Sequence, residues 1–502
     1  MTRLLYSLLF VTIFSISGLC QSPSKVLQNA EKALGGKKAL NAVTSWERTG
    51  TISRRSDGST GSFTQAAKAP NLYHISFDLG GFETEMGYNG RSGWRRDSRD
   101  GLSTLTGKQS SDFQAEASFR NSLWLNYKKE RAKISAGGIA EVNGKRANVV
   151  NYSTPRGSVI KLYFDAVTFL PLKEEIQYGD STDTIEYEDY RAVGAVKQAH
   201  KLTLRIGEQV FDIQLDSLRS NIHLDDAVFA FPEISGKPLP DIQKLLSELQ
   251  TNEDKVEDIL DTYSYTQKVT RRELGKDGIL RDTMSVTNQL SFYKGRRISR
   301  MVEKNGKPLS AKDQADEDKD AAKRVAEIDK EIAKEERRSQ SGPPNERSNR
   351  VSIAEVLRAS RLVNPRRERL KGRDVIVFDF EPNPTFDYKN AESMLKFFGK
   401  TIGVMWIDEK DKQVARLEAS LADSFNIGGG LVAKLRKGAS FVLEQERVND
   451  EIWLPSSADI NISVRVLLLR GINLNQIIRS YDYRKFATEV RDAAVDEIKD
   501  KN

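Results

Sequence analysis

Short runs in which apolar and polar residues alternate recur through most of this sequence. The clearest of these runs lie at 73–79, 82–88, 172–178, 201–206 and 211–216. Turn-forming pairs such as Asn89-Gly90 and Asn143-Gly144 separate several of them. Because the side chains of a strand point alternately to the two faces of its sheet, this alternation places the apolar residues on one face. The sequence therefore predicts antiparallel sheet with one dry face and one wet face.

The same order of elements is met twice along the chain. A helical pattern precedes each series of strand runs, first at 24–43, where Gly35-Gly36 interrupts it, and again at 241–260. Segment 452–462 also parallels segment 196–204, which indicates a repeat of the fold. We expect an α+β protein with two tandem units. The expected boundaries are 1–20 for a signal peptide, 21–236 for the first unit, 237–262 for a linker and helix, and 263–502 for the second unit.

The N-terminus has the form of a secretory signal peptide. Arg3 supplies a positive charge, an apolar run follows over 4–16, and Gly18 and Cys20 are small residues suited to a cleavage site. The run is shorter than the roughly 20 residues of a membrane-spanning helix. Two processing routes are open, cleavage after Cys20 or lipidation of Cys20. We expect cleavage, because Leu19 is larger than the residue that a lipidation signal requires before its cysteine. We also expect export to the periplasm, where the protein either stays in solution or associates with the outer membrane.

The sequence contains no motif for catalysis, for a metal site or for nucleic-acid binding. The three histidines, His74, His200 and His223, lie too far apart for the spacings typical of zinc sites. No Gly-x-Ser-x-Gly elbow occurs, and the glycine run at 428–430 is not followed by the Gly-Lys-Ser/Thr of a phosphate loop. The net charge of +7 is a modest basic excess for 502 residues. We expect a protein that is not an enzyme and has no cofactor, no metal and no nucleic-acid partner.

Several short segments together resemble the outer-membrane lipoprotein-sorting proteins, which have the LolA/LolB-like fold. These segments are the Gly35-Gly36 break before the first strand, Tyr88-Asn89-Gly90 followed by Trp94, the Leu-Pro-Leu at 170–172, and Asp-Asp-Ala-Val-Phe-Ala-Phe-Pro at 225–232. The resemblance implies two tandem incomplete antiparallel β-barrels, each wrapped around packed helices. It also implies a non-enzymatic binding protein for lipid or lipoprotein acyl chains, with a role in lipoprotein sorting. The alternative is an envelope scaffold that binds another protein and whose domain interiors are filled.

Apolar residues on the predicted dry face have two interpretations. They form either an ordinary core under the helices or the lining of an acyl-chain cavity, in which roughly 0.8 kcal/mol is gained for each buried CH₂. The candidate lining residues are Tyr73, Ile75, Phe77, Phe82, Met86, Trp94 and Trp124.

The second unit carries two further features. A dense cluster of cations consists of Arg358, Arg361, Arg366, Arg367, Arg369 and Lys371. It is either a solvated connector or a patch for an anionic membrane surface or an acidic partner protein. A charged insertion at 314–349 has a narrow apolar stripe of Val325, Ile328 and Ile332 at helical spacing. We expect a helix there, acting either as a movable cover and docking arm or as a passive insertion.

Overall fold

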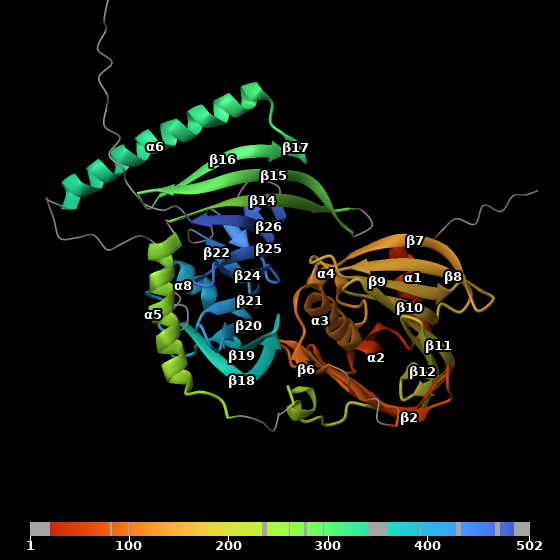
Figure 1. Cartoon of the computed structure of the whole chain (residues 1–502). Coiled ribbons are helices and arrows are strands. Elements are labelled where there is room, and N and C mark those ends of the chain that lie inside the picture. Colours follow the sequence, from red (N-terminus) through yellow and green to blue (C-terminus); the bar gives the residue numbers. More distant parts are fainter. Residues whose placement is uncertain are drawn as a thin grey trace, which may run out of the picture.

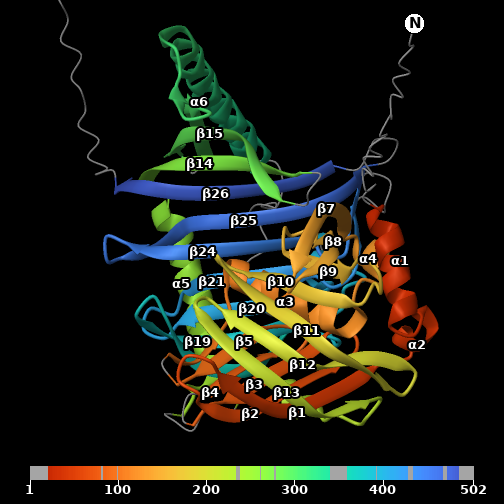
Figure 2. The ribbon, with the colours of Figure 1, turned by 90° about the vertical axis from the view of Figure 1, so that its right-hand side faces the viewer.

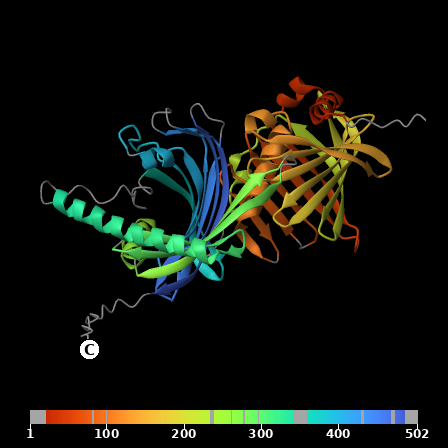
Figure 3. The ribbon, with the colours of Figure 1, turned by 90° about the horizontal axis from the view of Figure 1, so that it is seen from above.

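Two curved sheets lie side by side in the computed structural model of the chain (Figures 1 and 3). The structure describes residues 21–80, 83–98, 100–232, 238–260, 262–275, 279–294, 296–339, 359–391, 393–427, 433–466 and 472–485. The predicted signal peptide, with Cys20, therefore lies outside the described residues, as do Phe82 and Arg358. None of the helices within the described ranges is both long enough and apolar enough to cross a membrane.

The first domain is built on one antiparallel sheet of 13 strands, in the order β6-β5-β4-β3-β2-β1-β13-β12-β11-β10-β9-β8-β7. The chain runs outward from β1 to β6, crosses through helix α3, and returns from β7 to β13, which pairs with β1. Because β6 and β7 are the two ends of this order, the barrel is open between them. The strands are β1 Ser45–Arg54, β2 Thr60–Lys68, β3 Leu72–Asp78, β4 Glu83–Tyr88, β5 Gly93–Asp97, β6 Gly101–Thr104, β7 Lys133–Val142, β8 Lys145–Ser153, β9 Val159–Asp165, β10 Pro171–Tyr178, β11 Ser181–Val193, β12 Val196–Ile206 and β13 Gln209–Ser220.

The second domain follows the same route with its own antiparallel sheet, in the order β17-β16-β15-β14-β26-β25-β24-β21-β20-β19-β18. The hairpin of β22 and β23 is attached through β25. The last strand again pairs with the first, and β25 holds the place that β12 holds in the first sheet. The predicted repeat and the tandem incomplete barrels are thus confirmed. The strands are β14 Tyr263–Leu274, β15 Leu280–Tyr293, β16 Arg296–Lys304, β17 Lys307–Pro308, β18 Ser360–Leu370, β19 Arg373–Pro382, β20 Thr401–Asp408, β21 Val414–Leu421, β22 Phe425–Ile427, β23 Ala433–Leu435, β24 Ser440–Val448, β25 Ile452–Val466 and β26 Ile472–Lys485.

Helices fill the first domain from inside and close one of its ends. Helix α3 (Gly107–Ser122) places Phe113, Ala117 and Phe119 against the inner face of the sheet, where all three are fully buried. The short α4 (Tyr127–Glu130) follows it. Helix α1 (Pro23–Ala33) lies beside β7 and β8, and the short α2 (Lys37–Asn41) packs on α1 (Figure 2), as the helical pattern at 24–43 predicts.

The bend between α1 and α2 depends on glycine. Gly35 has a positive φ of 123°, and a Cβ atom there would lie 2.2 Å from the carbonyl oxygen of Ala195. A side chain at this position would therefore collide with the turn before β12. The same contact is fixed by a hydrogen bond from the Lys197 backbone N–H to the Leu34 carbonyl oxygen, 2.9 Å. The Gly35-Gly36 break thus allows the end of α1 to pack against the turn between β11 and β12.

Helix α5 (Ile242–Leu260) covers the inner face of the second sheet. Its Leu245 and Leu249 are buried against Ile376, Phe378 and other residues of β19, β20 and β21. The smaller helix α8 (Ser393–Phe398) precedes β20. The alternate residues of β19 point to the other face, where Val377 packs with Trp406 of β20. This outer face is turned toward the first domain (Figure 3).

The predicted helix in the insertion is present as α6 (Ala311–Ser339), which packs against β16 at the edge of the second sheet (Figure 1). Ile328 is fully buried, whereas Val325 and Ile332 are partly exposed. Two ion pairs attach α6 to the sheet, one from Lys294 to Asp329 (2.9 Å) and one from Arg300 to Asp318 (2.5 Å). The remainder of the insertion, 340–349, lies outside the described residues.

Candidate functional site

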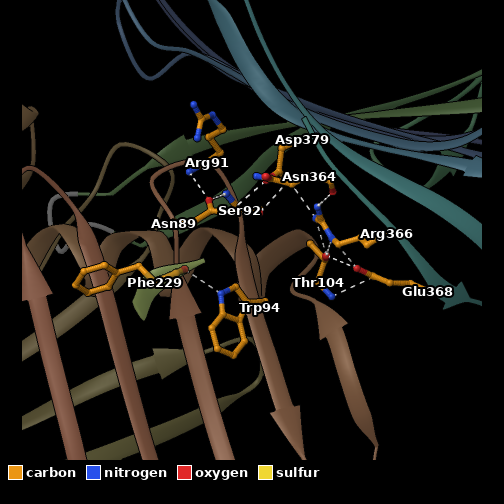
Figure 4. Close-up of polar contacts among 10 residues, drawn as sticks. All are labelled: Asn89, Arg91, Ser92, Trp94, Thr104, Phe229, Asn364, Arg366, Glu368 and Asp379. Atoms are coloured by element: carbon orange, nitrogen blue, oxygen red, sulfur yellow. Dashed lines mark hydrogen bonds and ion pairs between the residues drawn. The ribbon is translucent and has the colours of Figure 1, made fainter. Parts of the chain in front are cut away.

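A buried polar junction joins the two domains (Figure 4). Asp379 of β19 is fully buried and accepts hydrogen bonds from Asn89 Nδ2 (3.2 Å) and Ser92 Oγ (3.0 Å) in the turn between β4 and β5. Within its own domain it accepts one from Asn364 Nδ2 (2.9 Å) and one from Arg366 Nη2 (3.1 Å). A buried carboxylate is tolerated only when its oxygens are satisfied in this way. The Asn89-Gly90 turn predicted from the sequence therefore supplies half of the partners.

A second buried carboxylate at the junction belongs to Glu368 of β18. Its oxygens accept hydrogen bonds from the Thr104 hydroxyl (2.5 Å), from the Thr104 backbone N–H (3.1 Å) and from Arg366 Nε (3.0 Å). Arg366 is 6% exposed and stacks over the ring of Phe231 at 4.5 Å. The end of β6 is thereby fixed on β18.

Contacts farther along the same outer face extend the junction. The Gly107 backbone N–H, at the start of α3, donates to Glu418 Oε1 at 2.7 Å. Asn461 Nδ2 of β25 donates to the carbonyl oxygen of Pro155 in the loop between β8 and β9, at 3.0 Å. The first domain is thus held at its strand ends, its helix and its loop, and the two domains form a single packed body.

The described members of the cation cluster predicted at 358–371 each lie beside a carboxylate of this chain. Arg366 and Arg367 are largely buried in their pairs, whereas Arg361, Arg369 and Lys371 remain exposed. The pairs are Arg361–Glu381, Arg366–Asp379, Arg367–Glu409, Arg369–Asp374 and Lys371–Glu444. The physical reason is that 360–370 is a strand rather than a connector, and strand geometry directs Arg366 into the junction while its neighbour Arg367 points the other way.

A cavity of about 160 Å³ lies inside the first domain beneath α1 and α2. Apolar side chains from both helices, from the end of α3 and from β12 form much of its wall; these are Leu34, Leu40, Val43, Leu123, Leu125 and Val196. A dry cavity of this size accommodates a group the size of benzene. Its volume alone therefore suits a short apolar segment of a ligand.

The floor of this cavity is charged. Arg120 of α3 is 6% exposed and donates from Nε to Glu116 Oε1 (3.1 Å) and from Nη1 to Glu174 Oε2 (2.8 Å) and the Tyr187 hydroxyl (3.3 Å). Tyr187 donates in turn to Glu174 Oε2 at 2.8 Å. The remaining nitrogen of Arg120, Nη2, is buried without a hydrogen-bond partner among the described residues. Arg120 lines the cavity, but Nη2 itself has almost no exposed surface, so an acceptor oxygen reaches it only when neighbouring side chains shift.

A second arginine, Arg48, lines the same charged side of the cavity. Arg48 Nε donates to Gln65 Oε1 at 2.5 Å, and Gln65 Nε2 donates to the Tyr73 hydroxyl, which donates to Glu116 Oε1 at 3.2 Å. Burial lowers the pKa of Arg48 and raises the pKa of Glu116. Burial also opposes the charge of Arg120, but Glu174, Tyr187 and Glu116 hold the pKa of Arg120 above its ordinary value. The network therefore keeps a charged arginine beside an apolar wall.

The candidate lining residues from the sequence are divided by the structure. Tyr73, Ile75, Phe77 and Met86 share the inner face, because the register places Tyr73 opposite Tyr88 and Ile75 opposite Met86. They pack on α3 or on the opposite strands, as Phe77 does on Phe211. Trp124 is also buried, with its ring against Phe164 at 5.1 Å. These positions are occupied by core packing, and none of them lines the cavity.

Trp94 lies on the opposite face from this group. It is paired with Gly87, and its ring is near His74, on the side covered by the turn η1 (Asp226–Phe229). Its indole Nε1 donates to the Phe229 carbonyl oxygen at 3.2 Å (Figure 4). The segment at 225–232 thus covers the outer side of the sheet.

The residues of the charged floor were not singled out from the sequence. Arg48, Gln65 and Glu174 come from β1, β2 and β10, and no local pattern links them. The usable signal was the spacing of Glu116 and Arg120, one helical turn apart within an apolar and aromatic segment. Such a pair on the buried side of a helix needs further partners.

A larger cleft of about 910 Å³ lies between the domains, beside the cavity. One wall comes from α3, α4 and the loop at 154–156, and the other from Ser424 and the turn at 434–438. The cleft and the cavity share Leu40, Val43, Asn121, Ser122 and Leu125 in their linings.

Comparison with protein-family models gives no match, and neither does comparison with curated proteins. Solved structures do show likeness. A DUF1329 family protein from Desulfovibrio piger is 13% identical and has a TM-score of 0.31, covering 42% of this chain and 98% of its own. A LolA superfamily protein from Nitrosomonas europaea is 12% identical, with a TM-score of 0.29 and coverage of 42% and 98%. A MucA/MucB complex from Pseudomonas aeruginosa is 10% identical, with a TM-score of 0.16 and coverage of 93% and 99%.

The resemblance that the sequence motifs indicate is thus met among solved structures. At these identities and TM-scores the likeness concerns the type of sheet and nothing finer.

Proposed function

We propose that this chain is a non-enzymatic binding protein of the cell envelope whose first domain binds an acyl group, carbonyl end first, in the cavity beneath α1 and α2. The supporting observation is the buried Nη2 of Arg120, which has no hydrogen-bond partner among the described residues and belongs to a side chain lining that cavity. A carboxylate or ester carbonyl oxygen accepts this N–H, and the first carbons of the chain contact Leu40, Val43 and Leu125.

The size of the cavity limits how much of an acyl chain enters it. About 160 Å³ holds the carbonyl end and the first few carbons. The remainder of a longer chain extends over the shared rim into the cleft. Each carbon that is buried within the cavity is expected to increase the binding affinity. Carbons beyond the rim are less buried and are expected to increase the affinity less.

Calorimetric titration with hexanoate, hexanol and dodecanoate tests this function. Hexanoate is expected to bind more tightly than hexanol by roughly tenfold or more, because a hydrogen bond to a charged group contributes about 1.5–3 kcal/mol. Val43→Trp fills the mouth and is expected to abolish binding. Val167→Trp serves as the control, since Val167 is 85% exposed on the surface. Equal binding of hexanoate to wild type and Val43→Trp would refute the cavity as the site.

Export is tested by cell fractionation. Replacing Leu9 and Val11 with Asp interrupts the apolar run of the signal peptide, and the precursor is expected to stay in the cytoplasm. Accumulation of this variant in the periplasm would contradict export through this segment. A palmitate label that disappears in Cys20→Ser would show lipidation rather than simple cleavage.

The scaffold function has its own support. Helix α3 packs on the inner face of the first domain, and Tyr73, Ile75, Phe77, Met86 and Trp124 take part in that packing. A scaffold requires no internal ligand, and mass spectrometry of the purified native protein separates the two functions. Copurifying acylated molecules that are lost in Val43→Trp support acyl binding, whereas their absence from the wild-type protein supports the scaffold.

A further inference from the structure

The cleft between the domains is positively charged on both walls. Its lining contains six cationic side chains and one carboxylate, Glu130. The cations are Lys129, Arg131 and Arg156 from the first domain and Lys434, Arg436 and Lys437 from the second. Within the described part of the chain no ion pair involves any of the six, in contrast to the cluster at 361–371, although Asp423, which pairs with Lys400, lies near enough to Lys434 for their charges to interact.

Glu130 balances one of the six positive charges, and both of its oxygens accept hydrogen bonds from neutral hydroxyl groups. The Tyr152 hydroxyl donates to Oε2 at 2.8 Å, and Ser122 Oγ donates to Oε1 at 3.1 Å. Across the cleft, Arg131 and Arg436 are near enough to affect each other. Burial lowers the pKa of Arg131, and the positive charge of Arg436 lowers it further. Two partly buried guanidiniums on opposite walls repel each other unless an anion lies between them.

The form of the cleft decides which anion fits. A flat bilayer cannot reach Arg131, Arg156 and Arg436, which are partly buried within the walls. A compact phosphate group binds where donors converge on one point, whereas these cations come from three segments on two walls. The lining also contains apolar residues and a set of amide and hydroxyl side chains, which includes Asn71, Gln114, Asn126, Ser118 and Thr154. Such groups both donate and accept hydrogen bonds, as a peptide backbone requires.

We propose that this cleft binds an acidic segment of a partner protein, with its carboxylates between the two cationic walls. The volume of about 910 Å³ is at the upper end of ligand sites and suits an extended peptide of several residues. The buried junction at Asp379 and Glu368 fixes the two walls relative to each other, so the site is formed before the partner arrives. This proposal does not require acyl binding in the neighbouring cavity, and an acyl chain long enough to pass the shared rim would compete with the peptide for part of the cleft.

The test is fluorescence anisotropy of the full mature chain with a labelled oligoglutamate peptide. The variant Lys434→Gln/Arg436→Gln/Lys437→Gln removes one wall of cations. The matched control, Lys161→Gln/Arg191→Gln/Lys201→Gln, removes the same charge from exposed positions on the first sheet. The cleft variant is expected to bind the peptide roughly tenfold or more weakly, while the control keeps the wild-type affinity. Binding is also expected to weaken as salt is added.

Three outcomes would overturn the proposal. The first is equal loss in the cleft variant and the control, which would indicate attraction by net charge alone. The second is no binding of oligoglutamate by the wild type. The third is stronger binding of inorganic phosphate or of phosphatidylglycerol vesicles that the cleft variant abolishes. If the cleft variant unfolds, Lys129→Gln/Arg156→Gln on the opposite wall is expected to give the same loss of peptide binding.

Discussion

In the first domain, the segment joining the outgoing strands to the returning strands is α3, which lies inside the sheet. In the second domain the corresponding segment begins with α6, which lies outside against β16. The strand route is the same in both. Helix α3 carries Phe113, Ala117 and Phe119 on its buried side, whereas α6 is charged around most of its surface and buries Ile328. The strand route therefore does not determine which helix enters the half-barrel; the apolar width of the helix does.

The inner position in the second domain is taken by α5, which comes before the first strand rather than between the two strand series. It covers β19, β20 and β21 through Leu245 and Leu249. In β15 and β16 the buried residues among those described are Thr287 and Leu290. The first domain is consequently packed by α3 along most of its inner face, with the cavity beneath α1 and α2 left open, whereas the packing of the second domain is concentrated at β19, β20 and β21. We expect the two domains to respond differently to matched substitutions.

The largest effect is expected from Phe119→Ala in α3. Removal of a fully buried phenylalanine that packs on Tyr152 costs about 3–5 kcal/mol of unfolding free energy. Denaturant titration followed by tryptophan fluorescence measures it. A loss below about 1 kcal/mol would mean that the interior around α3 collapses to fill the gap.

The next effect concerns the junction that keeps the domains together. Asp379→Ala leaves Asn89, Ser92 and Arg366 without their shared acceptor, and we expect a loss of about 2–3 kcal/mol. Calorimetry is expected to show the unfolding transition divide into two. Asp374→Ala is the control, because Asp374 is exposed at the end of the same strand. A single unshifted transition in Asp379→Ala would show that the other contacts suffice.

A smaller and local effect is expected in α6. Ile328→Ala removes its one fully buried side chain among those described, and we expect about 2 kcal/mol less protection of the α6 amides against hydrogen exchange. The exchange of β19 and β20 is expected to stay unchanged. Simultaneous loss of protection in those strands would mean that α6 belongs to the rigid core, and the predicted cover or docking arm at 314–349 should then be abandoned.

The smallest effect is a pH dependence that belongs to the first domain alone. Burial, with a contribution from Glu116, raises the pKa of Asp183 from 3.8 to about 7. The folded state then holds this proton more tightly than the unfolded state, so stability falls as pH rises from about 4 to 7. Asp183→Asn is expected to gain about 1–2 kcal/mol at pH 8, with solvent exposure allowed for, and nothing at pH 4. Equal gains at both pH values would contradict a raised pKa.

The sheets could be predicted because their evidence is local. Alternation at 73–79 and 201–206, the Asn89-Gly90 turn and the Gly35-Gly36 break each depend on a few consecutive residues. The repeat of 196–204 at 452–462 likewise placed β12 and β25 in equivalent positions. Backbone hydrogen bonding and burial act at this range, so the pattern in the sequence carries the information.

The binding features could not be predicted because they join distant segments. Arg366 and Glu368 have the pattern of a solvated strand face, and only the docking of the first domain buries them. Trp94 was grouped with the inner face, yet a turn shifts the phase of alternation and places it outside. The cationic cleft combines 129–131 with 434–437, which are separated by most of the chain. Such juxtapositions depend on how two complete sheets pack.

The closure of each sheet has a further consequence for the order of events during folding. Trp46 of β1 lies opposite Ser220 of β13, and Tyr263 of β14 lies opposite Lys485 of β26. Neither central pair can form until the last strand of its domain has been synthesised, and contacts between such distant residues form slowly. Until then β1 and β14 each lack a neighbour and are open to pairing with other chains. Under the export proposed above, this delay would keep the polypeptide unfolded during its transfer across a membrane.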